Sequence, residues 1–454
     1  MTRSIASAVA RFKQDPRAHL DHRLVLRACA AAQHRWRQRL LDPVTTLYLL
    51  ILQVLHGNCA CRRLRHLSGL RFSTSAYCKA RRRLPLDVLI AAAGELIGTA
   101  RRHTEDFGRW LGHRVLIIDG SGVSMPDTPA LQRAFGQPAA MKAGCGFPLM
   151  HLLVLFDAAT GLLVDLLPGR CHRHDLHDAA ALHPSLEAGD VLLGDRAFCS
   201  YAHLALLVQQ QIHGLFRLHQ RVIVDFAPRP RAFRPRKHRP RKRRRRGRPA
   251  SRLIQRLGKN DQLVEYRKPD KRPVWMNEQT FACLPTTLTL RELRYRVGQP
   301  GFRTRTVTLL TTLTDPRKYP RRELAQLYHR RGQVETNLLH LKHTMGLDVL
   351  RCQSADGVLK ELWAFVLVYN LVRMLMLEAA RRQDVPVDRI SFIDALDALR
   401  DRAPHEPVPA LAVNPSRPGR FEPRVLKRRK DRYSYLTKPR DRLRQALLHR
   451  AVAA

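Results

Sequence analysis

The segment YHRRGQVETNLLHLK, residues 328–342, places a phenol, two cations and a carboxylate at helical intervals. Tyr328, Arg331, Glu335 and Lys342 follow one another by three, four and seven residues, so on an α-helix they share one stripe. This pattern suits a site where a metal-bound Glu meets a phosphate backbone held by Arg, Lys and Tyr. Taken alone, an ordinary surface helix with an Arg–Glu pair at i, i+4 explains the segment equally well.

Two upstream aspartates favour the chemical interpretation. Asp119 follows the aliphatic run 115–118 and precedes a Gly-rich stretch, which predicts a buried strand that ends at the acid, followed by a turn. Asp195 follows the aliphatic residues 191–193 in the same way. A turn-capping role is the common alternative for Asp after a strand. Three carboxylates in one cleft repel one another without a cation, and oxygen ligands lacking a Cys or His set favour Mg²⁺ or Mn²⁺ over zinc.

With these residues in view, the chain resembles bacterial DDE transposases of the insertion sequence 4 family. The family's Tyr-x2-Arg-x3-Glu-x6-Lys signature is matched by Tyr328, Arg331, Glu335 and Lys342. The segments IIDGSGVSMPDTP, GDVLLGDRAF, TLLTTLTDPRKYP and LKELWAFVLVYNLVR also look like the family, so the similarity runs from about residue 113 to 373. One residue departs from the pattern: similar proteins usually carry Trp directly after the signature Arg, whereas this chain has Gly332.

The resemblance implies a transposase that hydrolyses phosphodiester bonds at transposon ends and joins the freed 3′-hydroxyls to target DNA. Two Mg²⁺ or Mn²⁺ ions would be held by three carboxylates, with the first as the bridging ligand: Asp119, Asp195 and Glu335. Phosphates beside the cut would be bound by the remaining signature residues, Arg331, Lys342 and Tyr328. Because two ends must be joined, the resemblance also implies a homodimer on double-stranded DNA.

Other functions fit parts of the same pattern. A nuclease of the same fold would cut without joining, and a transposase derivative that binds DNA without catalysis is suggested by Gly332. Some family members stack a flipped base on a tryptophan of their insertion, and Trp275 is the only Trp between Asp195 and Glu335. A buried strand residue is the simpler interpretation of Trp275.

The composition indicates a polyanionic partner. The 454 residues include 81 Lys and Arg against 38 Asp and Glu, a net charge of +43, which favours salt-dependent nucleic acid binding. A ribosomal-type basic protein would explain this charge but not the three acids. The Pro-Arg segment 229–249 is expected to be unfolded until it meets DNA.

Targeting features point to the bacterial cytoplasm, with nucleoid association when DNA is bound. No signal-peptide pattern opens the chain, and the apolar run Trp363–Leu377, broken by Asn370 and Arg373, predicts a buried helix and no membrane span. The nine scattered cysteines are typical of reduced thiols. A group that could recruit a soft metal matches no standard zinc spacing: Cys171, His172, His174 and His177.

The order of predicted elements is α/β, and the resemblance implies a ribonuclease-H-like mixed sheet interrupted by a β-rich insertion, after an N-terminal helical domain. The expected boundaries are a DNA-binding domain at 1–105, a core at 106–212 and 321–400, an insertion at 213–320 and a basic tail at 401–454. Within the first domain, a polar cap at 73–75 and a basic helix predict either a helix-turn-helix or a plain amphipathic helix. DNA contacts are expected from Lys79, Arg81 and Arg82.

Overall fold

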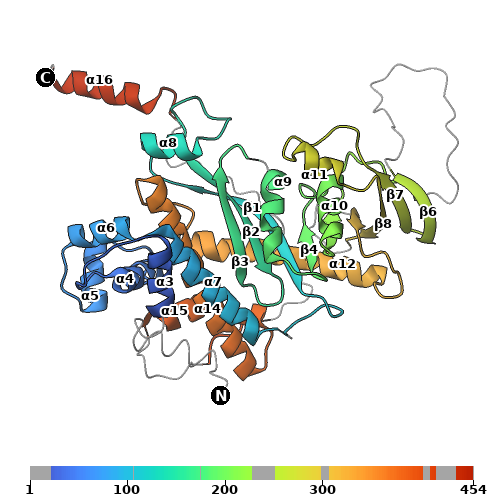
Figure 1. The fold of residues 1–454 in the computed structure, drawn as a ribbon, viewed down its shortest axis with the longest axis horizontal. Coiled ribbons are helices and arrows are strands. Elements are labelled where there is room, and N and C mark those ends of the chain that lie inside the picture. The colour runs from blue at the N-terminus through green and yellow to red at the C-terminus, as the bar shows by residue number, and fades with distance from the viewer. Residues whose placement is uncertain are drawn as a thin grey trace.

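A computed structural model describes residues 22–105, 107–173, 175–226, 251–297, 306–401, 410–415 and 436–452. Within these ranges a nine-stranded mixed sheet runs through the molecule in the order β3-β2-β1-β4-β5-β9-β8-β7-β6. The N-terminal helices lie at one end of the molecule and strands β6 to β8 at the other (Figure 1). The predicted Pro-Arg segment 229–249 lies outside the described residues.

Five strands make one half of the sheet. The aliphatic run 191–193 predicts β4 close to its observed bounds, and the chain pairs β1, β2 and β3 antiparallel but β1, β4 and β5 parallel. A parallel connection needs a crossover, and α10 (Tyr201–Gln209) supplies it between β4 and β5. The five strands are β1 (Val115–Ser124), β2 (Leu149–Asp157), β3 (Leu163–Arg170), β4 (Val191–Gly194) and β5 (His213–Arg217).

The strand that carries Asp119 is longer than predicted. The expected strand ends at the acid, but β1 continues through Gly120 and Gly122 to Ser124 and stays paired with β2. The glycine is needed for close approach and not for a turn, because a Cβ on Gly120 would lie 2.2 Å from the Asp175 Oδ1 atom. The same Oδ1 atom lies 2.6 Å from the His151 Nε2 atom on β2.

The predicted β-rich insertion extends the same sheet. Strand β9 pairs with both β5 and β8, so the remaining strands continue the five-stranded half without a break. The expected boundary at residue 213 therefore falls on β5, which already pairs with β4. A short helix, α11 (Glu278–Ala282), connects β7 to β8. The four strands of this half are β6 (Ser251–Gly258), β7 (Asp261–Arg267), β8 (Thr287–Arg296) and β9 (Thr306–Thr311).

The first described helices pack against a helix from the far end of the chain. Asp42 caps α4 by accepting a 2.6 Å hydrogen bond from the Thr45 N atom, and Pro43 suits the first helical position. Both α4 and α7 contact α14. The early helical elements are α3 (His22–Ala31), α4 (Pro43–Leu55), η1 (Cys61–Arg63), α5 (Leu64–Ser68), α6 (Thr74–Arg83) and α7 (Leu86–His103).

Helix α14 (Ala355–Gln383) contains the apolar run predicted to be buried. It is long and apolar enough to cross a membrane, but 94% of its most apolar window is buried inside the protein, as in the core helix of a soluble protein. The polar residues that interrupt the run dock the helix on β3 and the preceding turn. Asn370 exchanges two 2.9 Å hydrogen bonds with the Leu163 backbone, and the Arg373 Nε atom donates to the Thr160 carbonyl at 3.1 Å.

The remaining helical elements surround these layers. Figure 1 shows α16 projecting from the body of the molecule, although its first residue, Arg440, lies 3.0 Å from the Asp127 Oδ2 atom. These elements are α8 (Pro129–Phe135), α9 (Asp175–Asp178), η2 (Ala179–Ser185), α12 (Arg321–His329), η3 (Arg330–Gly332), α13 (Gln333–Leu339), η4 (His340–Thr344), η5 (Val387–Arg389), α15 (Phe392–Asp401) and α16 (Arg440–Val452).

The sheet separates two apolar cores. On β1, Val115 and Ile117 pack into a first core with α14, while Leu116 and Ile118 pack into a second core with α10. Successive strand residues therefore face opposite cores, which decides where each acid of the candidate site lies.

Two histidines are stacked in the second core. The His183 and His203 Nε2 atoms lie 3.1 Å apart, and the His203 Nδ1 atom lies 2.8 Å from the Phe198 carbonyl, in the turn after β4. A neutral pair satisfies this contact with one ring donating and the other accepting. Burial lowers the pKa of His183 to about 3 and the pKa of His203 to about 4.

Acid should therefore destabilise the fold before most carboxylates titrate. The unfolded chain binds protons at these histidines below about pH 6.5 and the folded chain does not, so stability falls as pH drops from 6.5 toward 4. Each histidine contributes a slope of up to about 1.4 kcal/mol per pH unit. Urea denaturation at pH 7.5 and pH 5 should show a smaller difference for His203→Gln than for the wild type. His103→Gln, at an exposed position, should retain the wild-type difference, and equal pH dependence in all three proteins would contradict the assignment.

Candidate active site

The first acid lies on β1, and the second directly follows β4, the neighbouring parallel strand. The register pairs Val115 with Val191 and Ile117 with Leu193, two residues before each acid, and Asp195 is near enough for its charge to act on Asp119. Neighbouring strands are about 4.8 Å apart. Ile117 faces the first core, so the alternation of β1 directs Asp119 to that side of the sheet.

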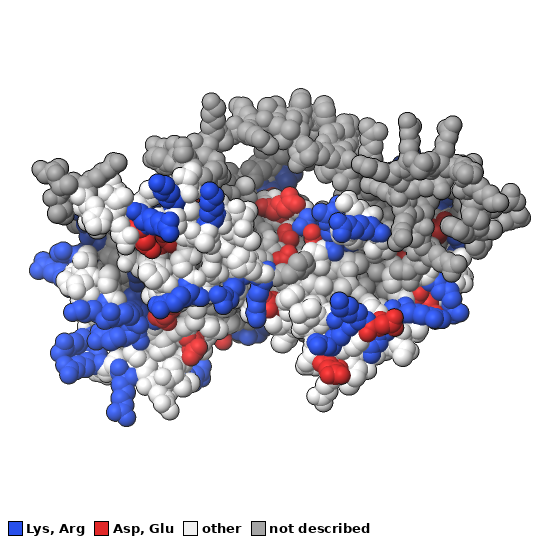
Figure 2. Space-filling view, turned by 90° about the horizontal axis from the view of Figure 1, so that it is seen from above, with Lys and Arg blue, Asp and Glu red and all other residues white. Residues whose placement is uncertain are grey.

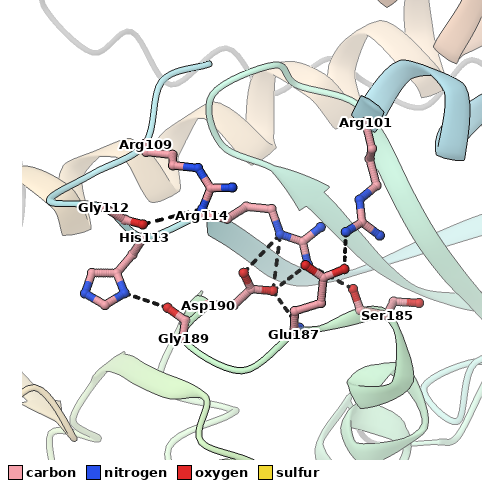
Figure 3. Close-up of polar contacts among 9 residues, drawn as sticks. All are labelled: Arg101, Arg109, Gly112, His113, Arg114, Ser185, Glu187, Gly189 and Asp190. Carbon is pink, nitrogen blue, oxygen red and sulfur yellow. Dashed lines mark hydrogen bonds and ion pairs between the residues drawn. The ribbon is translucent and has the colours of Figure 1, made fainter. Parts of the chain in front are cut away.

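An ion pair at the start of the two strands supports this register. Arg114, one residue before β1, donates from Nε to the Asp190 Oδ1 atom at 3.0 Å, and Asp190 directly precedes β4 (Figure 3). The backbone carbonyl of Arg114 accepts a 2.9 Å hydrogen bond from the Val191 N atom. Both side chains are largely buried, 13% and 5% exposed. Around them, Glu187 binds Arg101, and the His113 Nδ1 atom contacts the Gly189 carbonyl.

The third acid joins the first through one guanidinium. Arg331 donates from Nη2 to the Asp119 Oδ2 atom at 3.0 Å and from Nη1 to the Glu335 Oε1 atom at 3.2 Å. Burial raises the pKa of Asp119, Arg331 opposes that shift, and the nearby charge of Asp195 adds to it. Arg331 thus contacts two of the three predicted acids, whereas Asp195 acts on Asp119 and Arg331 only through its nearby charge. Glu335 keeps 71% of its side chain exposed.

The spacing predicts that the signature residues share one α-helix, but in the structure that helix is interrupted. Tyr328 lies near the end of α12, Arg331 lies in the 3-10 turn η3, Glu335 lies in α13, and Lys342 lies in the π-helical turn η4. A 3-10 turn is tighter than an α-turn, so the rotation between successive side chains changes. The stripe therefore bends between Tyr328 and Lys342.

Lys342 and Tyr328 flank the acids. The Lys342 Nζ atom donates to the Ser121 Oγ atom at 3.1 Å, and Ser121 lies two residues after Asp119 on the same face of β1. Burial lowers the pKa of Lys342. Tyr328 is 9% exposed, and burial raises the pKa of its hydroxyl. The charges of Arg331 and Arg217 oppose this shift of the pKa, and the charge of Asp195 adds to it.

Three residues beside the site were missed by the sequence analysis. Ser121 follows Asp119 by two residues on β1 and contacts Lys342, and Asp175 lies over Gly120, the residue next to Asp119. Arg217 on β5 lies near enough to Tyr328 for its charge to act on the hydroxyl. Only Ser121 had a local signal, because it follows Asp119 at the strand period. The other two reach the site through sheet pairing and crossover connections.

The predicted basic helix exists as α6, capped by Ser73, whose Oγ atom accepts from the Ala76 N atom at 3.1 Å. Lys79 and Arg82 are exposed. Arg81 requires a correction as a DNA contact, because its guanidinium turns inward and donates to the Gln53 Oε1 atom at 3.2 Å. The short α5, the left-handed Gly69 and α6 form a helix, a turn and a second helix, away from β1 (Figure 1).

Metal-ligand geometry is not preassembled in the described ranges, where no group of three or more His, Cys, Asp or Glu side chains is arranged to hold an ion. The candidate soft-metal group includes His174, which lies outside the described residues. Trp275 is not the buried strand residue of the simpler interpretation: it lies half-buried in a turn before α11, where it packs against the second core. All nine cysteines are free thiols.

Loss of the Asp190 carboxylate should destabilise the whole sheet. Asp190→Ala leaves the buried Arg114 charge unpaired, which costs about 3–5 kcal/mol. Glu187→Ala removes an exposed partner of Arg101 and should cost at most about 1 kcal/mol. Equilibrium unfolding in urea measures both, and comparable small losses would show that the register does not depend on the Arg114 ion pair.

Gly332 should be replaceable. It has helical backbone angles, φ −60° and ψ −21°, and a Cβ at this position would meet no atom within 4 Å. Gly332→Ala should therefore raise the free energy of unfolding by up to about 1 kcal/mol. Gly94→Ala, at an exposed glycine within α7 that also has open space, is the matched control. A gain at residue 94 together with a loss at residue 332 would mean that the signature segment needs glycine.

The comparisons with known proteins agree with this geometry. The family model described as transposase DDE domain matches residues 110–371, more than half of the chain. The transposase InsG of insertion sequence element IS4 from Escherichia coli K12 is 26% identical over 277 residues, which cover 60% of this chain and 54% of that protein. The chain thus spans about half the length of this relative.

Among solved structures, a chain of the cryo-EM structure of a piggyBac transposase synaptic complex with hairpin DNA is similar at a TM-score of 0.41 and 12% identity. The match covers 87% of this chain and 79% of that chain, and at this TM-score it carries no argument. The residues that the family model matches include Asp119, Asp195 and Glu335. This chain belongs to the transposases with a DDE domain.

Proposed function

We propose that this protein is the transposase of an insertion sequence, which cleaves transposon ends and joins the 3′-hydroxyls to target DNA. The observation that carries the proposal is the contact of both Asp119 and Glu335 with Arg331, with Asp195 directly after the neighbouring strand β4. Family membership supports the reaction class. The alternative, a metal-dependent nuclease without strand transfer, would use the same three acids.

We infer that the core is ribonuclease-H-like. The support is the strand order β3-β2-β1-β4-β5, with antiparallel pairing among the first three strands and parallel pairing from β1 to β5. Strands β6 to β9 would be the insertion, sharing the sheet of the core. Helices α3 to α7 would form the N-terminal DNA-binding unit. The second part of the core would begin after β9, with α12.

The donor set fits divalent ions. Three carboxylates offer only hard oxygen atoms, which suit Mg²⁺ or Mn²⁺. Arg331, which pairs with Asp119 and Glu335, offsets only part of their repulsion. Asp119, Asp195 and Glu335 would hold two ions, which neutralise charge at the scissile phosphate and activate the attacking oxygen. Glu335 is exposed enough to turn from Arg331 toward such an ion.

The other signature residues would bind and orient the DNA backbone. Arg331, once its carboxylate partners hold an ion, can bind a phosphate oxygen with the two nitrogens that now face Asp119 and Glu335. Lys342 adds a point charge beside Ser121. Tyr328, held in a buried position, can donate a hydrogen bond to the same backbone.

The charge distribution supports double-stranded DNA as partner. Figure 2 shows Lys and Arg side chains crowded at the end of the molecule that carries α5 and α6 in Figure 1, in a chain of net charge +43. Because two transposon ends must be held together, the proposed synaptic complex contains a homodimer. The proposed location is the bacterial cytoplasm, on the nucleoid when DNA is bound.

Asp119→Asn should lower Mg²⁺-dependent cleavage of DNA that carries the flanks of the reading frame by more than about 100-fold. DNA binding should persist or improve slightly, because one negative charge near the phosphates is removed. Asp87→Asn, which removes an exposed acid on α7, should cleave like the wild type. Gel analysis of cleaved and joined products with a parallel binding titration measures these effects.

The same assay separates the candidate functions. Undiminished cleavage by Asp119→Asn would refute the assigned site. Cleavage without joined products in the wild type would favour the nuclease. Binding without any cleavage, in either Mg²⁺ or Mn²⁺, would identify a non-catalytic derivative.

A further inference from the structure

A basic pocket lies between residues 34–41 and helix α6. Its volume is about 830 Å³, within the range of ligand sites in proteins. No acidic side chain lines it, and six cations do: Arg35, Arg37, Arg39, Arg71, Lys79 and Arg83. Within the described part of the chain, none of the six forms an ion pair or a side-chain hydrogen bond. Among the described residues, the pocket is therefore a concentration of positive charge without an acidic partner.

One face of α6 forms a wall of this pocket. Ala76, Lys79, Ala80 and Arg83 line it, and their spacing places them on one side of the helix. The small alanines leave space beside the two cations. Tyr77 lies on the inward side, where its hydroxyl donates to the Gln53 Oε1 atom at 2.9 Å. This bond fixes the rotation of α6, so the cationic face is held toward the pocket.

The opposite wall carries an aromatic platform. Trp36 stacks on His34, with ring centroids 5.8 Å apart and planes at 19°, and remains 37% exposed. Burial, together with the charges of Arg83 and Lys360, lowers the pKa of His34, which favours the neutral imidazole. The ring that stacks on Trp36 is therefore an uncharged histidine. Phe72 lines the pocket as well. Exposed aromatic rings among cations are the features that bind unpaired nucleotides.

The exposed ring of Trp36 favours an unpaired strand over a duplex. The segment 34–41 and α6 both line the pocket beside it. In a duplex the flat faces of the bases are stacked on one another and cannot reach Trp36. In an unpaired strand they are free, while the phosphates remain within reach of the surrounding cations.

We propose that this pocket binds a single DNA strand, with a base stacked on Trp36 and the adjoining phosphates held by the six cations. The proposal rests on the proposed function, since opening or cleavage of a transposon end exposes such a strand. It adds to that function a site outside the three acids, which would hold an unpaired strand while the acids act on DNA.

Binding of fluorescent oligo(dT) and of a duplex of equal length, without divalent metal, tests the proposal by anisotropy over a range of NaCl concentrations. Trp36→Ala should weaken oligo(dT) binding about 5- to 150-fold, from about 1–3 kcal/mol per stacked base, and change duplex affinity less than about two-fold. Trp36→Phe should retain most of the affinity. Arg37→Gln with Arg39→Gln should weaken binding and flatten its salt dependence.

Arg381→Gln is the matched control for charge. Arg381 is exposed near the end of α14, about 30 Å along that helix from Lys360, whose Nζ atom contacts the Arg82 carbonyl. It should leave oligo(dT) affinity unchanged. Oligo(dT) should also quench tryptophan fluorescence of the wild type, and this quenching should be lost in Trp36→Phe. The fluorescence result tests the stacking even if Trp36→Ala unfolds.

Three results would overturn the proposal. They are unchanged oligo(dT) affinity in a folded Trp36→Ala, an equal loss of duplex affinity, and displacement of oligo(dT) by polyglutamate at the same charge concentration. The last would show a surface for any polyanion. Because the assay contains no divalent ion, it can fail while Asp119-dependent cleavage succeeds, so the two proposals are judged separately.

Discussion

The parallel pairing of β1 with β4 is the constraint on which the candidate site depends. Arg114 and Asp190 form a buried ion pair where the two strands start, and the Val191 N atom donates to the Arg114 carbonyl. A shift by one residue would send one acid to the opposite core, because strand side chains alternate. The site is therefore built by backbone pairing, and its geometry is set several residues from the acids themselves.

Charge balance on the side of the sheet that faces the first core explains why Arg331 and Glu335 lie beside Asp119. Asp119 is largely buried beside Asp195, and an uncompensated pair of buried acids is costly. Arg331 supplies the cation and also holds Glu335, so one guanidinium assembles the site from the sheet and the signature segment. The changes of helix type between Tyr328 and Lys342 direct these side chains to β1, where Lys342 reaches Ser121.

Local sequence predicted the strands before Asp119 and Asp195, because aliphatic runs are local signals. It also predicted the cap at Ser73 and the burial of α14. It did not predict that β1 continues past Asp119, since the reason, the Asp175 carboxylate over Gly120, comes from another segment. The inward turn of Arg81 likewise depends on Gln53, a residue of another helix. Contacts between distant segments were the part that spacing alone could not supply.

The most direct test of the account maps where a divalent ion binds. Fe²⁺ in place of Mg²⁺, with ascorbate and peroxide, generates radicals that cut the polypeptide beside the bound ion. We expect Mg²⁺-suppressible cuts near residues 119, 195 and 335 together, because the register of β1 and β4 and the signature segment bring these positions to one place. Suppressible cuts confined to other segments would contradict the claim that the three acids form one metal site.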